Sequence, residues 1–253
     1  MIAFLLFIST ALSAECSHGT YSMCSSNSAA VTWDYVLHVQ TWAGYFCSTK
    51  CCDLPSTTMD VHEGFTMHGW WPNFISGYPS CCKQSDFTDA EVTSMIESDS
   101  TLKKDLAYYW PSFTKCHFFQ YEYDKHGTCI QDMYAGLTGV KNYANAAMNF
   151  MKNHDIWSIF KKNGVTADGS TKYSKSWLKQ LVQNEFGVQN CVFFTCSSNY
   201  LSEMRICTTV SKANQNEPTV IECPGTVIED QETCGDNIVF YKLLSLTESG
   251  CEY

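Results

Sequence analysis

The chain has 253 residues and a formal net charge of −10, from 26 acidic and 16 basic side chains. This length is sufficient for one large domain with a substantial core. The acidic charge argues against a protein that grips many phosphates of a nucleic-acid duplex, because such proteins are normally basic. It does not exclude an enzyme that handles a short single-stranded segment, for which a few local cations suffice.

Residues 1–14 (MIAFLLFISTALSA) are uncharged and apolar and end in small residues. This pattern predicts a secretory signal peptide that is cleaved after Ser13 or Ala14. The segment is too short to span a membrane as a helix, and no later stretch is long enough. We therefore expect residues 15–253 to form a single domain with no membrane partner. It would be secreted or delivered to a lysosome-like or vacuole-like compartment.

All 15 cysteines follow the predicted signal peptide. In an exported chain they predict disulfide bonds, which persist in oxidising compartments. Because 15 is an odd number, one cysteine is expected to be unpaired or bonded to another chain, and we otherwise expect a monomer. A zinc site is less favoured, since Cys51–Cys52 and Cys81–Cys82 are adjacent pairs rather than C-x₂-C pairs. We expect neither a metal ion nor a cofactor.

The first predicted elements in chain order are strands. Residues 32–40 (TWDYVLHVQ) are rich in β-branched and aromatic residues, and alternate residues from position 36 would point to opposite faces of a sheet. Residues 42–52 read as a loop. Residues 64–68 (GFTMH) predict a short strand that breaks at Gly69 and Pro72.

Helices are expected next. Thr88 and Glu91 form a predicted capping box before apolar residues at helical spacing. Further helices are expected over residues 100–110, 118–126, 134–153, 155–162 and 173–186. Residues 191–196 and 200–209 predict a pair of strands, a polar stretch follows over 211–236, and 237–246 predicts a last strand. This order predicts one α+β domain.

The predicted helix over residues 118–126 carries three groups with useful chemistry. Glu122 lies three residues before Lys125 and four before His126, so all three side chains would share one face. Gly127 would end the helix. The face would offer a carboxylate, an ammonium and an imidazole side by side. The alternative interpretation is a solvated, charged helix end.

A second imidazole, that of His68, lies at the end of a predicted strand. Two histidines on separate elements suggest a proton donor and a proton acceptor, although a lone histidine is more often structural. Such a pair can cleave RNA without a metal ion. One imidazole takes the proton from the 2′-OH that attacks phosphorus, and the other protonates the departing 5′-oxygen. A 2′,3′-cyclic phosphate results, and Lys125 could stabilise the charge that develops.

Two segments resemble the active-site segments of the T2 family of secreted ribonucleases: residues 65–73 (FTMHGWWPN) and 118–129 (FFQYEYDKHGTC). Shorter likenesses at residues 40–42 with Cys47, at 110–112 and at 204–207 extend the resemblance along most of the chain. The resemblance implies an α+β fold with a central antiparallel sheet, flanking helices and disulfides. It also implies an endoribonuclease whose substrate is single-stranded RNA.

The resemblance also implies roles for individual residues. His68 and His126 would be the acid–base pair, with Glu122 and Lys125 assisting at the phosphate. The expected neighbours of the two base sites are Trp71 and Asn73 for one, and Gln40, Pro111, Ser112 and Phe119 for the other. Aromatic rings suit such sites because bases stack on them, and core packing is the alternative for Trp71 and Phe119.

Two positions depart from the family pattern. Tyr121 stands where the family usually has a histidine that helps to hold the phosphate, so we expect activity that is retained but reduced or shifted in pH. Asn73 replaces a frequent aspartate, which leaves the base preference open. The alternative hypothesis is a T2-like secreted RNA-binding or signalling protein that has lost turnover. A purely structural disulfide-rich protein would leave the histidines, Lys125 and Glu122 unexplained.

Overall fold

The structure is a computed structural model that describes residues 19–25, 32–55, 63–82, 87–130, 132–244, 246–248 and 253. The predicted signal peptide lies outside these residues. The strands are β1 (Tyr35–Trp42), β2 (Asp53–Leu54), β3 (Phe65–Asn73), β4 (Lys172–Ser174), β5 (Val192–Ser197), β6 (Tyr200–Thr209), β7 (Thr219–Val220), β8 (Asn237–Val239) and β9 (Thr247–Glu248). The helices are α1 (Ala43–Thr49), α2 (Asp89–Ser98), α3 (Ser100–Tyr109), α4 (Phe118–Lys125), α5 (Gly136–Asn153), α6 (Ile156–Lys162), α7 (Lys175–Phe186) and α8 (Gly225–Gln231), with a 3₁₀ helix over Gly127–Ile130.

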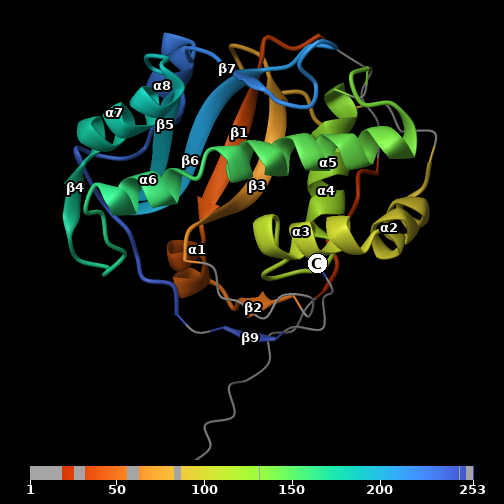
Figure 1. The fold of residues 1–253 in the computed structure, drawn as a ribbon, viewed down its shortest axis with the longest axis horizontal. Coiled ribbons are helices and arrows are strands. Elements are labelled where there is room, and N and C mark those ends of the chain that lie inside the picture. The colour runs from red at the N-terminus through yellow and green to blue at the C-terminus, as the bar shows by residue number, and fades with distance from the viewer. Residues whose placement is uncertain are drawn as a thin grey trace, which may run out of the picture.

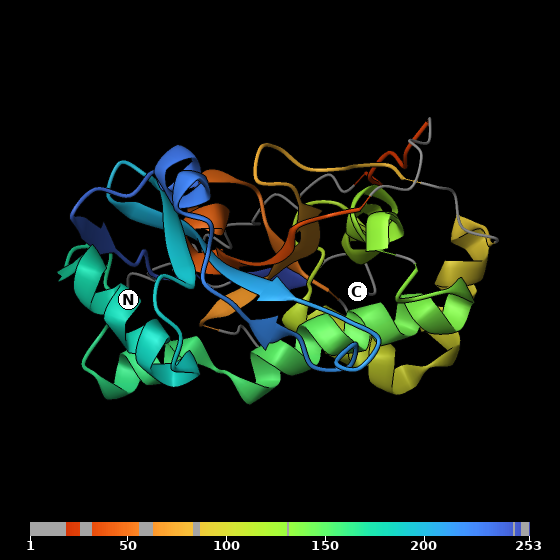
Figure 2. The ribbon, with the colours of Figure 1, turned by 90° about the horizontal axis from the view of Figure 1, so that it is seen from above.

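A seven-stranded sheet forms the centre of the fold, with the strand order β3-β1-β6-β8-β4 and with β5 and β7 also paired to β6. β1 pairs antiparallel with both β3 and β6, and the predicted β5–β6 hairpin is antiparallel as well. A single parallel contact joins β6 to β8. Helix α5 crosses one face of the sheet (Figures 1 and 2). The predicted α+β fold, with a mainly antiparallel central sheet and flanking helices, is confirmed.

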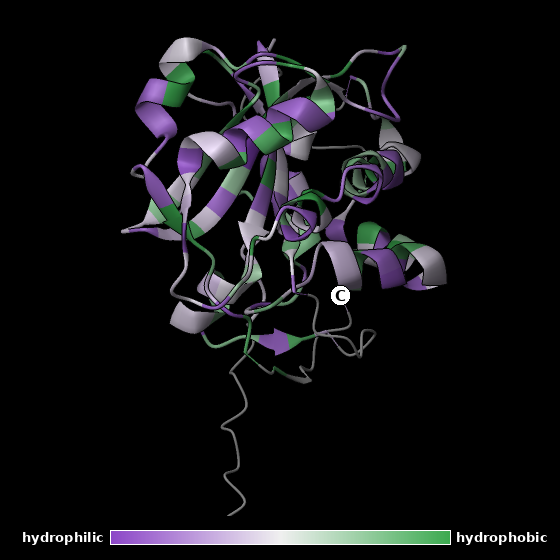
Figure 3. Ribbon diagram, turned by 60° about the vertical axis from the view of Figure 1, so that its left-hand side comes forward, coloured by the Kyte–Doolittle hydropathy of each residue, from purple (hydrophilic) through white to green (hydrophobic). Residues whose placement is uncertain are grey.

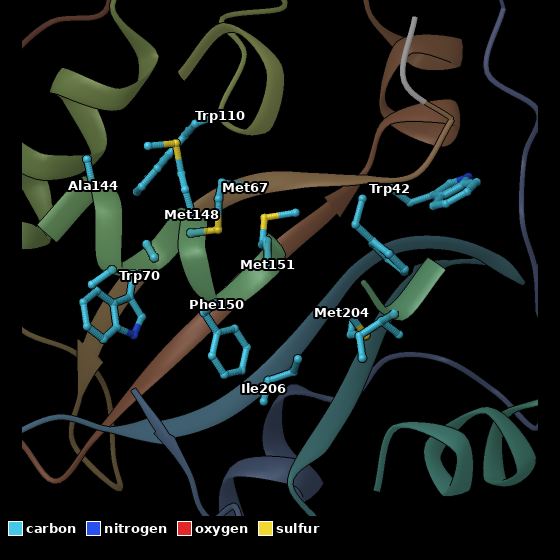
Figure 4. Packing of buried hydrophobic residues seen from close by; sticks show 14 of the residues in the cluster. Trp42, Met67, Trp70, Trp110, Ala144, Met148, Phe150, Met151, Met204 and Ile206 are labelled. Atoms are coloured by element: carbon cyan, nitrogen blue, oxygen red, sulfur yellow. The ribbon is translucent and has the colours of Figure 1, made fainter. Parts of the chain in front are cut away.

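The main hydrophobic core lies between α5 and the sheet. Methionines from α5, β3 and β6 pack there beside Trp70 and Phe150 (Figure 4). Val36 of β1 belongs to this core, whereas Leu37 and Val39 belong to a smaller cluster on the other face, beside α8. Alternate residues of β1 therefore point to opposite faces of the sheet, as predicted. The helices also carry both hydrophobic and hydrophilic residues along their length (Figure 3).

Strand β3 is longer than predicted. It continues through Gly69 and Pro72 to Asn73, so the prediction of a break there was wrong. Because β3 is an edge strand, the missing N–H of a proline is tolerated in it. Gly69 is required by packing: a Cβ at this position would lie 1.9 Å from the indole nitrogen of Trp71.

Other boundaries also differ from the prediction. Helix α4 ends at Lys125, with His126 as its C-terminal cap, and Gly127 opens the 3₁₀ helix instead of ending α4 in a left-handed turn. A Cβ at Gly127 would lie 2.4 Å from the Tyr123 ring, so close packing explains this glycine. Helix α1 occupies part of the predicted loop, and α8 lies in the polar stretch. The last predicted strand ends early, at Val239.

Disulfides join pairs of described cysteines: Cys24–Cys81, Cys47–Cys52, Cys82–Cys129, Cys196–Cys234 and Cys207–Cys223. Cys51 and Cys116 are also disulfide-bonded, and Cys191 is the free, buried cysteine of the described residues. Within the described ranges, no cluster of three or more His, Cys, Asp or Glu side chains could hold a metal ion. No helix among the described residues is long and apolar enough to cross a membrane.

Candidate active site

The C-terminal part of α4 and the middle of β3 meet at a cavity of about 560 Å³, which we call the main cavity. Most of the predicted site residues line it: His68, Trp71, Asn73, Tyr121, Glu122, Lys125 and His126. Glu122, Lys125 and His126 reach it together because their spacing places them on one face of the helix. The predicted juxtaposition with His68 is therefore present in the structure.

His68 is held by a carboxylate from another strand. Its Nδ1 lies 2.5 Å from Oε1 of Glu203 on β6 and donates a hydrogen bond to it, so Nε2 is the nitrogen left to face Glu122 Oε1, at 3.9 Å. Burial disfavours the charged imidazole, but the hydrogen bond and charge of Glu203, together with the charge of Glu122, raise the pKa of His68 above its usual value. His68 thus favours its protonated form.

Glu203 is itself fixed by Arg205, two residues further along the same face of β6. The Arg205 guanidinium donates to Glu203 Oε2 from Nε at 3.0 Å and from Nη2 at 2.7 Å. Its third contact is with Gln231 Oε1, at 2.8 Å, and it lies over the Trp71 ring. Burial raises the pKa of Glu203, but His68 and Arg205 outweigh it and lower this pKa to about 2. Glu203 therefore remains ionised.

His126 lies in the opposite electrostatic environment. Its side chain is buried against the Trp71 ring, with ring centroids 4.9 Å apart, and its Nδ1 has no hydrogen-bond partner among the described residues. Burial, followed by the charges of Lys125 and His68, lowers the pKa of His126 to about 3. His126 is therefore neutral over a wide pH range and can accept a proton.

Glu122 and Lys125 complete the polar part of the main cavity. Trp71 Nε1–H donates to Glu122 Oε2 at 2.7 Å, and burial raises the pKa of this carboxyl group despite the opposing charges of His68 and Lys125. Lys125 Nζ donates to the Tyr121 hydroxyl at 3.3 Å. The polar lining of the main cavity therefore combines two imidazoles, a carboxyl group and an ammonium group.

Only some of the predicted base-site residues line the main cavity or its neighbour. Trp71 and Asn73 line the main cavity, and Pro111 lines a neighbouring side cavity of about 230 Å³. Gln40 contributes instead to a third, smaller cavity and donates to His38 Nδ1, while Ser112 Oγ accepts the N–H that begins α4.

Phe119, the remaining predicted base-site residue, packs in the core against Trp110. Its neighbour Phe118 lines both the main and the side cavity. The rotation of α4 about its axis thus places the Phe118 ring at the cavities and the Phe119 ring in the core.

Several residues that line the two cavities were not among the predicted site residues: Tyr21, Tyr78, Arg205 and Gln231 in the main cavity, and Glu203 in the neighbouring side cavity. Glu203 and Arg205 share one face of a strand, a period-two signal that the sequence contains. However, β6 reaches His68 only across the intervening β1, and that register is not evident from the local pattern. Tyr78 is 58% exposed in the loop after β3, and no sequence pattern indicates which way the side chain of such a loop residue points.

The imidazoles of His68 and His126 line one cavity of a disulfide-bonded α+β fold. The sequence pattern of the Ribonuclease T2 family matches residues 33–223, and the chain belongs to this family.

Relatives extend over most of the chain. Extracellular ribonuclease LE of Solanum lycopersicum is 29% identical over 245 residues, which cover 94% of this chain and 96% of the relative. Ribonuclease Rh of Rhizopus niveus is 29% identical over 210 residues, covering 78% and 79%.

Solved structures share the fold. The RNase-related protein from Calystegia sepium superposes with a TM-score of 0.64 at 23% identity, covering 83% of this chain and 98% of that one. RNase NT in complex with 5′-AMP superposes with a TM-score of 0.64 at 24% identity, covering 83% and 99%.

Proposed function

We propose that the protein is an endoribonuclease that cleaves single-stranded RNA by transphosphorylation through a 2′,3′-cyclic phosphate. The observation that carries this proposal is the opposite electrostatic environment of two histidines in one cavity. The raised pKa of His68 and the lowered pKa of His126 support His68 as the acid and His126 as the base. The two imidazoles supply both proton transfers, so the reaction as proposed uses no metal ion.

In the first step, His126 takes the proton of the ribose 2′-OH, whose oxygen attacks the adjacent phosphorus. The bond from phosphorus to the 5′-oxygen breaks, and protonated His68 gives its Nε2 proton to that oxygen. Lys125 stabilises the negative charge that develops on the phosphorane. In the second step the roles reverse, and water opens the cyclic phosphate to a 3′-phosphate.

The surroundings of the histidines suit a nucleotide chain. Trp71 and Tyr78 line the main cavity and offer aromatic rings for one base, with Asn73 beside them. The side cavity begins beyond His68 and is lined by Pro111 and Phe118, so it suits the nucleoside that departs. The bound 5′-AMP of RNase NT, which has the same fold, supports a nucleotide-binding role.

The experiment that tests the proposal is incubation of the purified protein with RNA at pH 4–8 in EDTA, followed by identification of the product ends. We expect 2′,3′-cyclic phosphates that convert to 3′-phosphates. If RNA is bound but neither product forms, the alternative of a T2-like RNA-binding or signalling protein without turnover is favoured.

Tyr121 provides a test by gain of function. Its phenol can donate a hydrogen bond to phosphate but carries no positive charge, whereas a protonated imidazole would do both. Tyr121→His is expected to raise kcat/KM for RNA about fivefold, the difference between a neutral and a charge-assisted hydrogen bond. The gain should be present at acidic pH, where the new imidazole is protonated, and fade as the pH rises, with the Lys125 charge beside it lowering the pKa of that imidazole.

The control for this experiment is Tyr121→Phe, which keeps the ring but cannot donate to phosphate and should show no gain. Pre-steady-state or steady-state kinetics on one RNA substrate across pH 4–8 would decide. Equal rates for Tyr121→His and the unmodified protein at every pH would contradict a phosphate-binding role for this position.

We further propose that residues 1–14 are a signal peptide and that residues 15–253 form one domain. The protein would then be secreted or reach a lysosome-like or vacuole-like compartment, as a monomer with Cys191 unpaired. The disulfides and the extracellular relative from Solanum lycopersicum support this proposal.

A further inference from the structure

An N-terminal strap, residues 19–25, crosses the site and lies outside the family match, which begins at residue 33. The strap is fixed at two points. At its start, Gly19 O accepts the N–H of Cys116 at 3.0 Å, and at its other end Cys24 forms a disulfide with Cys81. The N–H of Cys24 also donates to Asp124 Oδ2 of α4 at 2.5 Å.

These anchors place Tyr21 against the exposed side of α4. Its ring stacks on Tyr121, with ring centroids 4.7 Å apart and an interplanar angle of 21°, and lies 5.4 Å from the Phe118 ring. Its hydroxyl is 3.4 Å from Thr114 Oγ1, and Lys115 Nζ lies 5.3 Å from the ring centroid. Contacts on several sides hold the Tyr21 ring in one orientation.

Tyr21 lies at the boundary between the two cavities. Three residues, Tyr21, His68 and Phe118, line both of them. In the proposed reaction His68 protonates the departing 5′-oxygen, so the phosphate occupies the main cavity and the departing nucleoside leads into the side cavity. The chain of the substrate must therefore pass Tyr21 at this boundary.

We propose that Tyr21 is a substrate-binding residue that holds the departing nucleoside, a contact that the strap supplies. This inference rests on the proposed ribonuclease function. A rigid aromatic ring loses little conformational entropy when it contacts a base or ribose, which makes it effective at such a position. The contact exists only for a substrate that extends beyond the phosphate.

The test compares two substrates of the full-length mature protein. A dinucleoside phosphate fills both cavities, whereas a nucleoside 2′,3′-cyclic phosphate has no departing nucleoside and fills only the main cavity. In Tyr21→Ala the ratio of kcat/KM for the dinucleoside phosphate to kcat/KM for the cyclic phosphate should fall about tenfold, the effect of losing one aromatic contact with a nucleoside. Tyr21→Phe keeps the ring and should restore the ratio.

Tyr45→Ala is the matched control, because Tyr45 also stacks on a tyrosine, Tyr200, and neither residue lines the main or the side cavity. Its ratio should not change. An unchanged ratio in Tyr21→Ala would overturn the inference. If both kcat/KM values fall equally, Tyr21 has a structural role; if neither falls, Tyr21 does not contact the substrate. Failure of the proposed function is a separate result: the unmodified protein would then turn over neither substrate.

Discussion

Replacing His126 with alanine is expected to lower kcat/KM for RNA by about 10²–10⁴-fold, the usual contribution of one general acid or base. The imidazole is buried against Trp71, and its lowered pKa keeps it neutral and ready to take the 2′-OH proton. A substituted side chain without a basic nitrogen cannot do this. The measurement is the initial rate of cleavage of a dinucleoside phosphate, with excess enzyme where turnover is slow.

His154→Ala is the matched control, since His154 is a half-buried histidine outside the main and side cavities that pairs with Glu185 at 3.0 Å. Its variant should retain the activity of the unmodified protein. Because the removed imidazole of His126 leaves a void, thermal unfolding followed by circular dichroism should accompany the kinetics. Full activity in a folded His126→Ala variant would falsify the proposed mechanism.

Local spacing was sufficient to predict the helical half of the site. Glu122, Lys125 and His126 lie at intervals of three and four residues. Helical periodicity places such residues on one face without any contribution from tertiary contacts. His68 could be found because its neighbours belong to a compact sequence motif.

The other half of the site depends on contacts distant in sequence. Glu203 reaches His68 across the full width of β1, and a register shift in the β1–β3 pairing helps to set that distance. Tyr21 reaches the site through a disulfide whose partner is 57 residues away. Disulfide connectivity and strand register are not fixed by local propensity, so neither residue was predictable. The cavities are lined by Phe118 and not by the predicted Phe119, which depends on the rotation of α4 about its axis.

The acid–base assignment leads to the second large effect, at Glu203. In Glu203→Gln the amide oxygen can still accept the hydrogen bond from His68 Nδ1, so the orientation of the imidazole is kept and only the charge is lost. Glu122 still faces the ring from α4, but Arg205 now stands nearby without its carboxylate partner. Both changes on the β6 side disfavour the imidazolium, so the pKa of His68 should fall.

The sign of the resulting pH dependence follows from the role of His68 as acid. Activity requires its protonated form, so a lower pKa moves the alkaline limb of the kcat/KM profile to lower pH. Above that limb we expect kcat/KM to be lower by at least about tenfold, the effect of a pKa change of one unit, and we expect little loss near pH 4–5. The acidic limb belongs to His126, whose pKa is about 3, and should stay in place.

Glu185→Gln removes the carboxylate of the His154 pair and leaves the main and side cavities intact, so its profile should match that of the unmodified protein. The complete pH–rate profile distinguishes the explanations for Glu203→Gln. A uniform loss at every pH indicates that Glu203 only supports the fold. A shift of the acidic limb instead would make His68 the base and reverse the assignment. Movement of the alkaline limb alone requires that the Glu203 carboxylate keeps His68 protonated until the 5′-oxygen departs.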